Sequence, residues 1–451
     1  MAKNIHEIRD PIHVFVRLDS HEREVLNSRP FQRLRHIHQL ALTYLVYPGA
    51  THRRFEHSLG VMELASRVFD VITDKRNVTD KIKRLLPQIE QDDERNYWRR
   101  VIRMAALCHD IGHLPFSHAA EKELLPEEWN HERITREIIL SSEMESIWRD
   151  VTPPLRSDDI AKLALGPEKA NDLDFSDWET ILSEIIVGDA FGVDRMDYLL
   201  RDSHHIGVAY GRFDHHRLID TLRILHTPPS GEGEKGMSEE PALGVEQGGI
   251  QSAEALMLAR YFMFSQVYLH PVRRIYDIHL KDFLKQWLPE GVFSTEVDEH
   301  LNITDNEVNA ELVKAAYDSS YRGHIHAERI ICRKHFKVLY QRNPSDVRKN
   351  PEAGQSIYEE AQKQFGADKL RHDRYTQKGE ATDFPVLTRD GRLEPSIVIS
   401  KTLQHLSEVA EISIDFVFTD REIDKEARKW LNEHRGNAIK ISEEDDHDEK
   451  A

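Results

Sequence analysis

The chain has 451 residues, of which 39% are hydrophobic and 31% are charged, and its formal net charge is −18. That length favours two or three domains of about 150 residues each. The acidic balance argues against general binding to nucleic acid or anionic lipid, because such binding needs many Lys and Arg contacts to phosphate. With no long apolar run, no signal-peptide pattern and only Cys108 and Cys332, we expect a cytoplasmic protein without disulfides and without a membrane segment.

The first 50 residues form a lead-in segment before the chemical motifs. A turn at Asp10–His13 is followed by a helical pattern with apolar residues between Val25 and Leu40. We expect this segment to pack on the helices that come after it.

Residues 51–226 have helical periodicity and hold the candidate chemistry. One helix begins near His57, a second ends at His109 and Asp110, where Gly112 stops it, and a third begins near Asp194. Imidazole nitrogens and carboxylate oxygens suit a divalent first-row metal, and a site with few protein ligands leaves positions for water and substrate. A lone His-Asp pair is more often two groups that satisfy one another, so the metal hypothesis depends on the three segments together.

The helix that begins near Asp194 has a polar face. Asp194, Asp197, Tyr198, Arg201 and Asp202 follow one another at helical spacing. Such a stripe is usually a solvated, salt-bridged surface. Because it starts with a candidate metal ligand, we favour the wall of a pocket.

The second half of the chain changes character. Residues 227–250 are rich in Gly, Pro and Glu and predict a mobile loop, and residues 251–300 predict long helices that complete the core or an interface. Residues 301–440 predict a small α+β lobe, and 441–451 an acidic, disordered tail. Within the lobe we expect helices at 307–319 and 422–434 and strands at 336–340, 397–399 and 412–418.

The order His57, His109-Asp110, Asp194 resembles the H…HD…D pattern of HD-domain phosphohydrolases. The sequence motifs around these residues narrow the resemblance to the SAMHD-type deoxynucleoside triphosphate (dNTP) triphosphohydrolases. These motifs are Phe31-Gln32-Arg33-Leu34-Arg35, Arg54-Phe55-Glu56-His57-Ser58-Leu59-Gly60, Cys108-His109-Asp110-Ile111-Gly112-His113 and Asp197-Tyr198-Leu199-Leu200-Arg201-Asp202. The resemblance implies a mainly α fold, with a helical HD-domain core and a small α+β C-terminal lobe.

The resemblance also implies an activity and its residues. One divalent ion, which could be Fe, Mn, Zn, Ni or Co, would assist hydrolysis of dNTPs to deoxynucleoside and inorganic triphosphate, and Mg²⁺ would accompany the phosphates. The implied metal ligands are His57, His109, Asp110 and Asp194. The implied substrate contacts are Arg54 and Arg195 at the triphosphate, and Gln39, Leu40, Tyr198 and Asp202 around the sugar.

Proton transfer is assigned to nearby histidines. His118 and Glu121 are three residues apart, so the carboxylate can orient the imidazole and raise its basicity. His113 and His131 match family residues that contact phosphate or complete this dyad. A structural hydrogen bond is an alternative role for His131, and the pattern does not say which histidine is the acid.

The lead-in segment holds a possible regulatory nucleotide site. Gln32 and Arg35 match residues that hold a guanine-containing activator in the family, but Asn27 stands where guanine-regulated members have an acid. A helical packing face with a solvated arginine explains these three residues equally well. The family's members commonly form dimers or tetramers, so the resemblance implies a homo-oligomer.

Three functions remain open at this point. The first is a dNTP triphosphohydrolase, and the sequence leaves open whether a nucleotide activates it. The second is another HD phosphohydrolase, such as a phosphodiesterase or a single-strand nuclease, although the net acidity disfavours a nucleic-acid substrate. The third is a catalytically silent dNTP sensor. The full set of metal and proton-transfer residues argues against it, because a protein that only binds dNTPs does not need them.

Overall fold

The computed structural model describes residues 5–117, 121–226, 240–377, 383–409 and 412–440, and His118 therefore lies outside the described residues. The chain forms two compact units. The first comprises Met1–Met263, Val292–Val308 and Glu380–Ala410, and the second comprises Phe264–Gly291, Asn309–Gly379 and Glu411–Ala451. The second unit thus differs from the α+β lobe expected over 301–440, because two segments of that range fold with the first unit.

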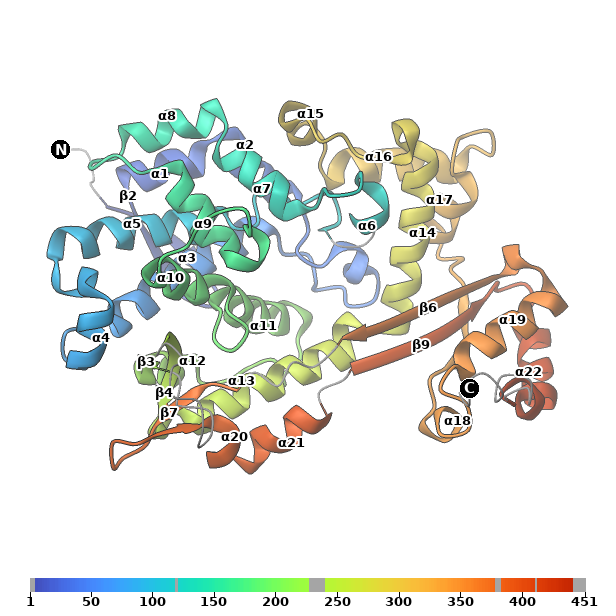
Figure 1. Ribbon diagram of the computed structural model, residues 1–451. Helices are drawn as coiled ribbons and strands as arrows, with labels where there is room; N and C mark the ends of the chain where they lie inside the picture. Colours follow the sequence, from blue (N-terminus) through green and yellow to red (C-terminus); the bar gives the residue numbers. More distant parts are fainter. Residues whose placement is uncertain (1–4, 118–120, 227–239, 378–382, 410–411, 441–451) are drawn as a thin grey trace, which may run out of the picture. The chain divides into compact units, whose positions relative to one another are not determined.

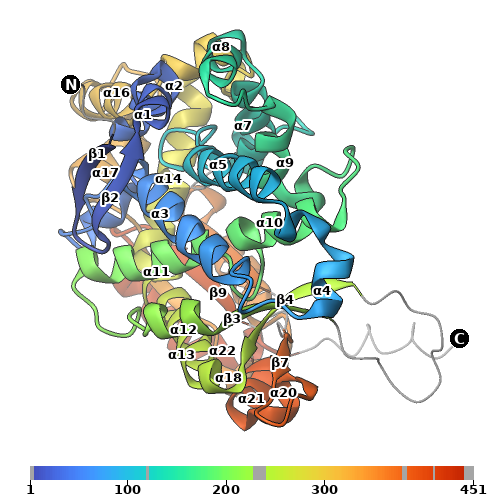
Figure 2. The ribbon, with the colours of Figure 1, turned by 90° about the vertical axis from the view of Figure 1, so that its left-hand side faces the viewer.

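The first unit is built on packed helices, as Figures 1 and 2 show for α3, α5, α9 and α10. α3 spans Arg54–Ile72 and α5 spans Asp92–Cys108. Apolar residues recur around α3, and Leu59, Met62 and Val68 are at most 2% exposed, so this helix is buried on several sides. α9 (Ser157–Lys169), α10 (Asp177–Val187) and α11 (Val193–Ile206) complete the bundle. The mainly α fold expected from the sequence is confirmed.

A short hairpin precedes these helices. β1 (Ile5–Asp10) and β2 (Val14–Asp19) pair antiparallel, with Asp10 opposite Val14 at the turn. α1 (Ser20–Asn27) and α2 (Arg29–Arg33) follow, and Asp19 caps α1 by accepting a hydrogen bond from the Glu22 N–H. The helical lead-in is confirmed, but the strand character of residues 5–10 was missed.

A four-stranded sheet in the first unit corrects two expectations. Its strands are β3 (Leu222–His226), β4 (Pro241–Glu246), β7 (Pro385–Leu387) and β8 (Leu393–Pro395), in that order. Part of the predicted 227–250 loop is therefore strand β4, while residues 227–239 lie outside the described part. The predicted strand at 397–399 is wrong, because the apolar run there forms the short helix α20 (Ser396–Ile399) after Pro395.

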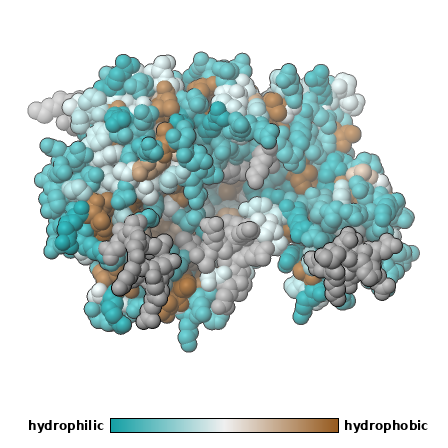
Figure 3. Space-filling model, viewed as in Figure 1, coloured by the Kyte–Doolittle hydropathy of each residue, from teal (hydrophilic) through white to brown (hydrophobic). Residues whose placement is uncertain are grey.

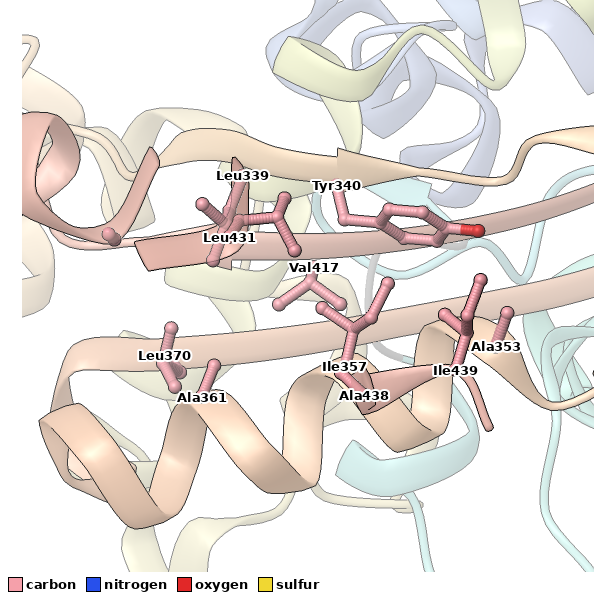
Figure 4. Close-up of a cluster of buried hydrophobic side chains, with 11 residues drawn as sticks. Leu339, Tyr340, Ala353, Ile357, Ala361, Leu370, Val417, Leu431, Ala438 and Ile439 are labelled. Carbon is pink, nitrogen blue, oxygen red and sulfur yellow. The ribbon is translucent and has the colours of Figure 1, made fainter. Parts of the chain in front are cut away.

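The second unit contains a three-stranded antiparallel sheet with helices against it. The strand order is β5 (Lys337–Gln341), β9 (Ile412–Thr419), β6 (Leu370–Gln377). α19 (Ala353–Phe365) and α22 (Asp424–Ala438) cover one face, where Ile357 and Val417 meet in a buried cluster (Figure 4). α14 (Pro271–Trp287) contributes Ile275 to a second cluster with Phe336 and Phe418. The prediction of a small α+β lobe in the C-terminal part of the chain is thereby confirmed.

The remaining helices are short or connect these elements. They are α4 (Asp80–Leu85), α6 (Glu121–Leu124), α7 (His131–Ile139), α8 (Ser142–Asp150), α12 (His215–Thr221), α13 (Ile250–Met263), α15 (Val297–Leu301), α16 (Asp305–Tyr317), α17 (His324–Ile331), α18 (Pro344–Val347) and α21 (Lys401–Val409). The face in Figure 3 is largely hydrophilic, with scattered hydrophobic residues. Over the described ranges, none of the helices combines the length and the apolar character needed to cross a membrane.

The buried cluster of the second unit generates a stability prediction. Ile357 is 0% exposed, so Ile357→Ala removes packed methyl groups and should destabilise this unit by about 2–5 kcal/mol. Hydrogen exchange of the β9 amides reports the opening of this unit directly, which matters because a chain with two units need not unfold in one step. Val313→Ala on α16, at a side chain that is 47% exposed, is the control and should change the opening free energy by less than about 0.5 kcal/mol.

Candidate metal centre and adjoining cleft

Three separate helices bring together the four predicted metal ligands. His57 lies in the first turns of α3, His109 and Asp110 follow the last residue of α5, and Asp194 lies in the first turn of α11. The His57 Nε2 atom is 3.0 Å from Asp194 Oδ1 and 3.6 Å from Asp110 Oδ2. The His109 Nε2 atom is 3.4 Å from Asp194 Oδ1 and 3.5 Å from Asp110 Oδ1.

Hydrogen bonds behind the two imidazoles turn their Nε2 atoms toward this centre. His109 Nδ1 donates to the Ala106 carbonyl at 2.8 Å, and His57 Nδ1 donates to Asp197 Oδ2 at 2.8 Å. With the proton on Nδ1, the neutral form of each ring has its lone pair on Nε2, the tautomer that a metal-bound histidine needs. The buried His109 Nε2 atom has no hydrogen-bond partner among the described residues. His57, His109 and Asp194 offer ligand atoms that lie within 4.8 Å of one another, and Asp110 lies beside both histidines, an arrangement that fits a divalent first-row metal.

The carboxylates of this centre are held in their charged form. Burial opposes ionisation of Asp110 and Asp194, but the positive charge of Arg54 at Asp110, and the histidines at Asp194, outweigh it and keep both pKa values well below their ordinary range. Burial would likewise lower the pKa of His57, yet hydrogen bonds to Asp194 and Asp197 raise it to about 10. Both carboxylates are therefore ionised, the form in which they can ligate a metal ion.

The two arginines assigned to the triphosphate have protein partners. Arg54 is 3% exposed, pairs with Asp110 through Nη1 and donates from Nε to Ser117 Oγ at 2.9 Å. Arg195 donates to the carbonyl oxygens of Gly188, at 3.1 Å, and of Asp189. Both guanidinium groups are thus fixed in place at or next to ligand-bearing segments.

A histidine pair adjoins the centre on the side of Asp110. His113 Nε2 is 3.2 Å from Asp110 Oδ1, and the His113 and His131 rings stack with centroids 3.9 Å apart. Burial and the charge of Arg54 hold the pKa of His113 well below its ordinary value, so this ring is neutral. Gly112 permits the arrangement, since a Cβ there would overlap the backbone at His131 and Thr135.

Among the described residues, Glu121 is hydrogen-bonded to His131. His131 Nδ1 donates to Glu121 Oε1 at 2.7 Å, and the His131 backbone N–H donates to the same oxygen at 2.6 Å. The predicted His118–Glu121 pair involves a residue outside the described part of the chain and stays a prediction. The described dyad is Glu121–His131.

Two of the predicted sugar contacts, Gln39 and Asp202, are hydrogen-bonded to His52, a histidine that the sequence did not single out. His52 Nε2 donates to Asp202 Oδ1 at 2.7 Å, and the His52 carbonyl accepts from the Gln39 N–H at 3.1 Å. Leu40 is 8% exposed and Asp202 is 1% exposed, so both side chains are largely covered by protein. Tyr198 lies one helical turn before Asp202 on α11. The only sequence clue to His52 was its place two residues before Arg54.

The three candidate regulatory residues cluster at the start of the chain. Asn27 is exposed at the end of α1. Gln32 Nε2 donates to the Leu26 carbonyl at 2.6 Å, and Gln32 Oε1 accepts from Arg35 Nε at 2.9 Å. The Arg35 guanidinium lies 3.5 Å from the centroid of the Phe55 ring. Their regulatory role stays a prediction.

A cleft of about 550 Å³ reaches the metal centre within the first unit. His109, Asp110 and Asp194 line it at one end, together with His131 and Glu132. Phe384 and Pro385 also line it, although they lie some 190 positions beyond Asp194 in the sequence. No local pattern could have indicated them, because they arrive through the return of residues 380–410 to this unit.

Comparisons with known proteins agree with this geometry. The HD domain family matches residues 54–170, and the HD associated region matches residues 213–411. Uncharacterized protein MJ1154 of Methanocaldococcus jannaschii is 36% identical over 61% of this chain and 48% of its own length. Uncharacterized protein YwfO of Bacillus subtilis is 34% identical over 65% of this chain and 59% of its own.

Two further relatives bear on fold and activity. Deoxynucleoside triphosphate triphosphohydrolase SAMHD1 of Bos taurus is 28% identical over 69% of this chain and 51% of its own length. This chain therefore spans about half the length of the curated relatives it matches. A crystal structure of a hypothetical protein from Aquifex aeolicus is 32% identical, with a TM-score of 0.75 over 95% of this chain and 100% of that one.

The convergence of the four side chains predicts stoichiometric metal binding. The protein should bind one Co²⁺ or Mn²⁺ ion per chain in equilibrium dialysis followed by elemental analysis. His109→Gln and Asp194→Asn each remove a direct ligand and should weaken binding by more than about 100-fold, since even outer-shell partners contribute 10–100-fold. His405→Gln, at an exposed histidine on α21, should bind as the unmodified protein does. Undiminished binding by both ligand variants would rule out this centre.

Proposed function

This chain belongs to the HD-domain family with an HD associated region, and from that premise we propose that it hydrolyses dNTPs to deoxynucleoside and inorganic triphosphate. The observation that carries the proposal is that His57, His109 and Asp194 converge as candidate ligands, with Asp110 in contact with both histidines, beside the Glu121–His131 dyad. A binding protein needs a pocket for its ligand. It does not need a charged metal centre next to an imidazole oriented by a carboxylate.

The metal ligands would act as a unit. A divalent ion held there would polarise a phosphate oxygen and lower the pKa of water near neutrality, and Mg²⁺ would accompany the nucleotide phosphates. Arg54, already fixed against Asp110 and Ser117, would present positive charge to the α-phosphate without needing to reorganise. Arg195 would do the same from α11.

The dyad would handle the proton of the leaving group. Glu121 accepts from His131 Nδ1, so His131 Nε2 is the atom that can give or take a proton in the site. In the proposed reaction this nitrogen protonates the 5′-oxygen as its bond to the α-phosphorus breaks. His113, stacked on His131, limits that ring to one orientation.

The sugar would lie between α11 and the segment after α2. Tyr198 and Asp202 approach it from α11, and Gln39 and Leu40 approach it from the other side, with His52 joining the two walls. A close wall at the 2′ position would exclude ribonucleotides. We include in the proposal a cytoplasmic homo-oligomer with a nucleotide site at Gln32 and Arg35, where Asn27 disfavours strict guanine selectivity.

Product analysis tests the reaction. The metal-loaded protein should convert each dNTP, added singly and in mixtures, to deoxynucleoside and intact triphosphate, as separated by ion-exchange chromatography. Ribonucleoside triphosphates should react much more slowly. Pyrophosphate as the product would contradict the proposed bond cleavage, and turnover only in mixtures would reveal a required activator.

The dyad can be tested apart from the metal. Glu121→Gln leaves all four proposed metal ligands intact but removes the carboxylate that accepts from His131 Nδ1 and orients the ring, so kcat should fall by about 10²–10⁴-fold with unchanged metal content. Glu123→Gln, two residues away on α6, is the matched control and should retain activity. Loss of metal from the Glu121 variant would instead assign this carboxylate to the metal centre.

A further inference from the structure

Asp197 lies behind the metal centre and makes a complete set of hydrogen bonds. Its side chain is 0% exposed, one turn after Asp194 on α11. Oδ2 accepts from His57 Nδ1 at 2.8 Å and from Arg201 Nε at 2.8 Å. Oδ1 accepts from His13 Nε2 at 2.7 Å and from Arg201 Nη2 at 2.9 Å. All four acceptor positions of the carboxylate are therefore used.

The same network continues into the N-terminal hairpin. Arg201 is 0% exposed and donates from Nη1 to Asp10 Oδ2 at 2.8 Å. The other oxygen of Asp10 accepts from the backbone N–H groups of Ile12 and His13, both at 2.8 Å. Asp10 thus shapes the turn that presents His13, and both residues of the hairpin reach the same buried ion pair.

A glycine makes room for this network. Gly60 lies on α3 one turn after His57, and a Cβ there would overlap Asp197 Oδ1 and the Arg201 guanidinium. The close approach of α11 to α3 is what allows one carboxylate to reach His57 from behind. No such constraint would be needed if Asp197 and Arg201 formed a solvated surface pair.

We propose that Asp197, Arg201, Asp10 and His13 are positioning residues that fix the ring of His57, so that the N-terminal hairpin is a working part of the metal centre. The inference rests on the proposed metal site and adds residues that do not touch the ion. Its physical basis is that a carboxylate behind a metal-bound histidine fixes the tautomer and the ring plane. Asp197 can do so only if its own position is fixed, which Arg201 and His13 provide.

The hydrogen bonds of the network support this role over simple packing. Asp197 is fully buried, and Arg201, His13 and His57 together donate four hydrogen bonds to its carboxylate. An ionised carboxylate raises the basicity of the imidazole that donates to it. Removal of one partner leaves a hydrogen-bond acceptor of the buried Asp197 carboxylate unpaired, and the position of the His57 ring that it holds is then less well fixed.

Titration with Co²⁺ tests the proposal, because the visible absorption of the bound ion reports the geometry of its ligands as well as its affinity. Asp197→Asn should weaken Co²⁺ binding by about 10–100-fold and change the spectrum. His13→Leu and Asp10→Asn, which are remote from the ion, should weaken it several-fold. His13→Gln keeps a side-chain N–H donor and should restore most of the affinity.

Two controls separate positioning from stability. The first control is Glu7→Gln, because Glu7 lies on the same hairpin and forms an exposed ion pair with Arg17. The second is Arg99→Lys, because Arg99 donates two hydrogen bonds to Asp70 outside the site. Both should leave the Co²⁺ spectrum and affinity unchanged. Circular dichroism and thermal melting show which variants are folded at the temperature of the titration.

The outcomes distinguish this inference from the metal site itself. If the unmodified protein binds Co²⁺ but the folded His13→Leu and Asp10→Asn proteins match it in spectrum and affinity, the hairpin has only a structural role and the inference is overturned. If these variants only melt earlier, the same conclusion holds. If the unmodified protein binds no Co²⁺, the proposed function and this inference both fall.

Discussion

The carboxylates of Asp110 and Asp194, facing the Nε2 atoms of two histidines, are the constraint on which the rest of the site depends. Two ionised acids that lie 3.0–3.6 Å from these nitrogen atoms need positive charge among them. Arg54 supplies part of that charge from one side. A divalent ion would supply the remainder, and its presence would join α3, α5 and α11 as firmly as any packing contact.

Helix α11 contributes two kinds of side chain to the metal centre: a candidate ligand, and a carboxylate that binds the far side of His57. Asp194 faces the two histidines, and Asp197, one turn later, passes behind His57 to meet Arg201 and the hairpin. Helical spacing explains this arrangement, because residues three and four apart lie on the same side of a helix at different heights. The stripe of polar residues on α11 is therefore not a solvated surface. Asp197, Arg201 and Asp202 are buried, and Asp194 lines the cleft.

The cleft beside the centre depends on chain segments from both ends of the first unit. His109, Asp110 and Asp194 come from the helical core, whereas Phe384 and Pro385 come from the segment that returns after residue 379. β4 and β7 pair in parallel at this point and hold the returning segment in place. The HD associated region, which the family comparison matches over 213–411, thus contributes residues to the surroundings of the HD centre.

The sequence alone determined the elements that local periodicity controls. The helices that carry His57, His109 and Asp194, the strand near 412–418 and the mainly α fold could all be predicted, because apolar spacing and glycine stops act within a few residues. The pattern of four ligand residues could also be recognised, through motif order. Strand β4 and helix α20 were missed, since a short segment takes its conformation from its neighbours in space.

Only the tertiary structure decided which partners the site residues have. Glu121 binds His131, and His52 joins Gln39 to Asp202. His13 reaches Asp197, and Asp10 reaches Arg201, each across more than 180 positions. All these contacts follow from how the helices pack. Hydrogen-bond partners are chosen by distance and direction in the folded chain, and neither is encoded in the spacing of residues along it.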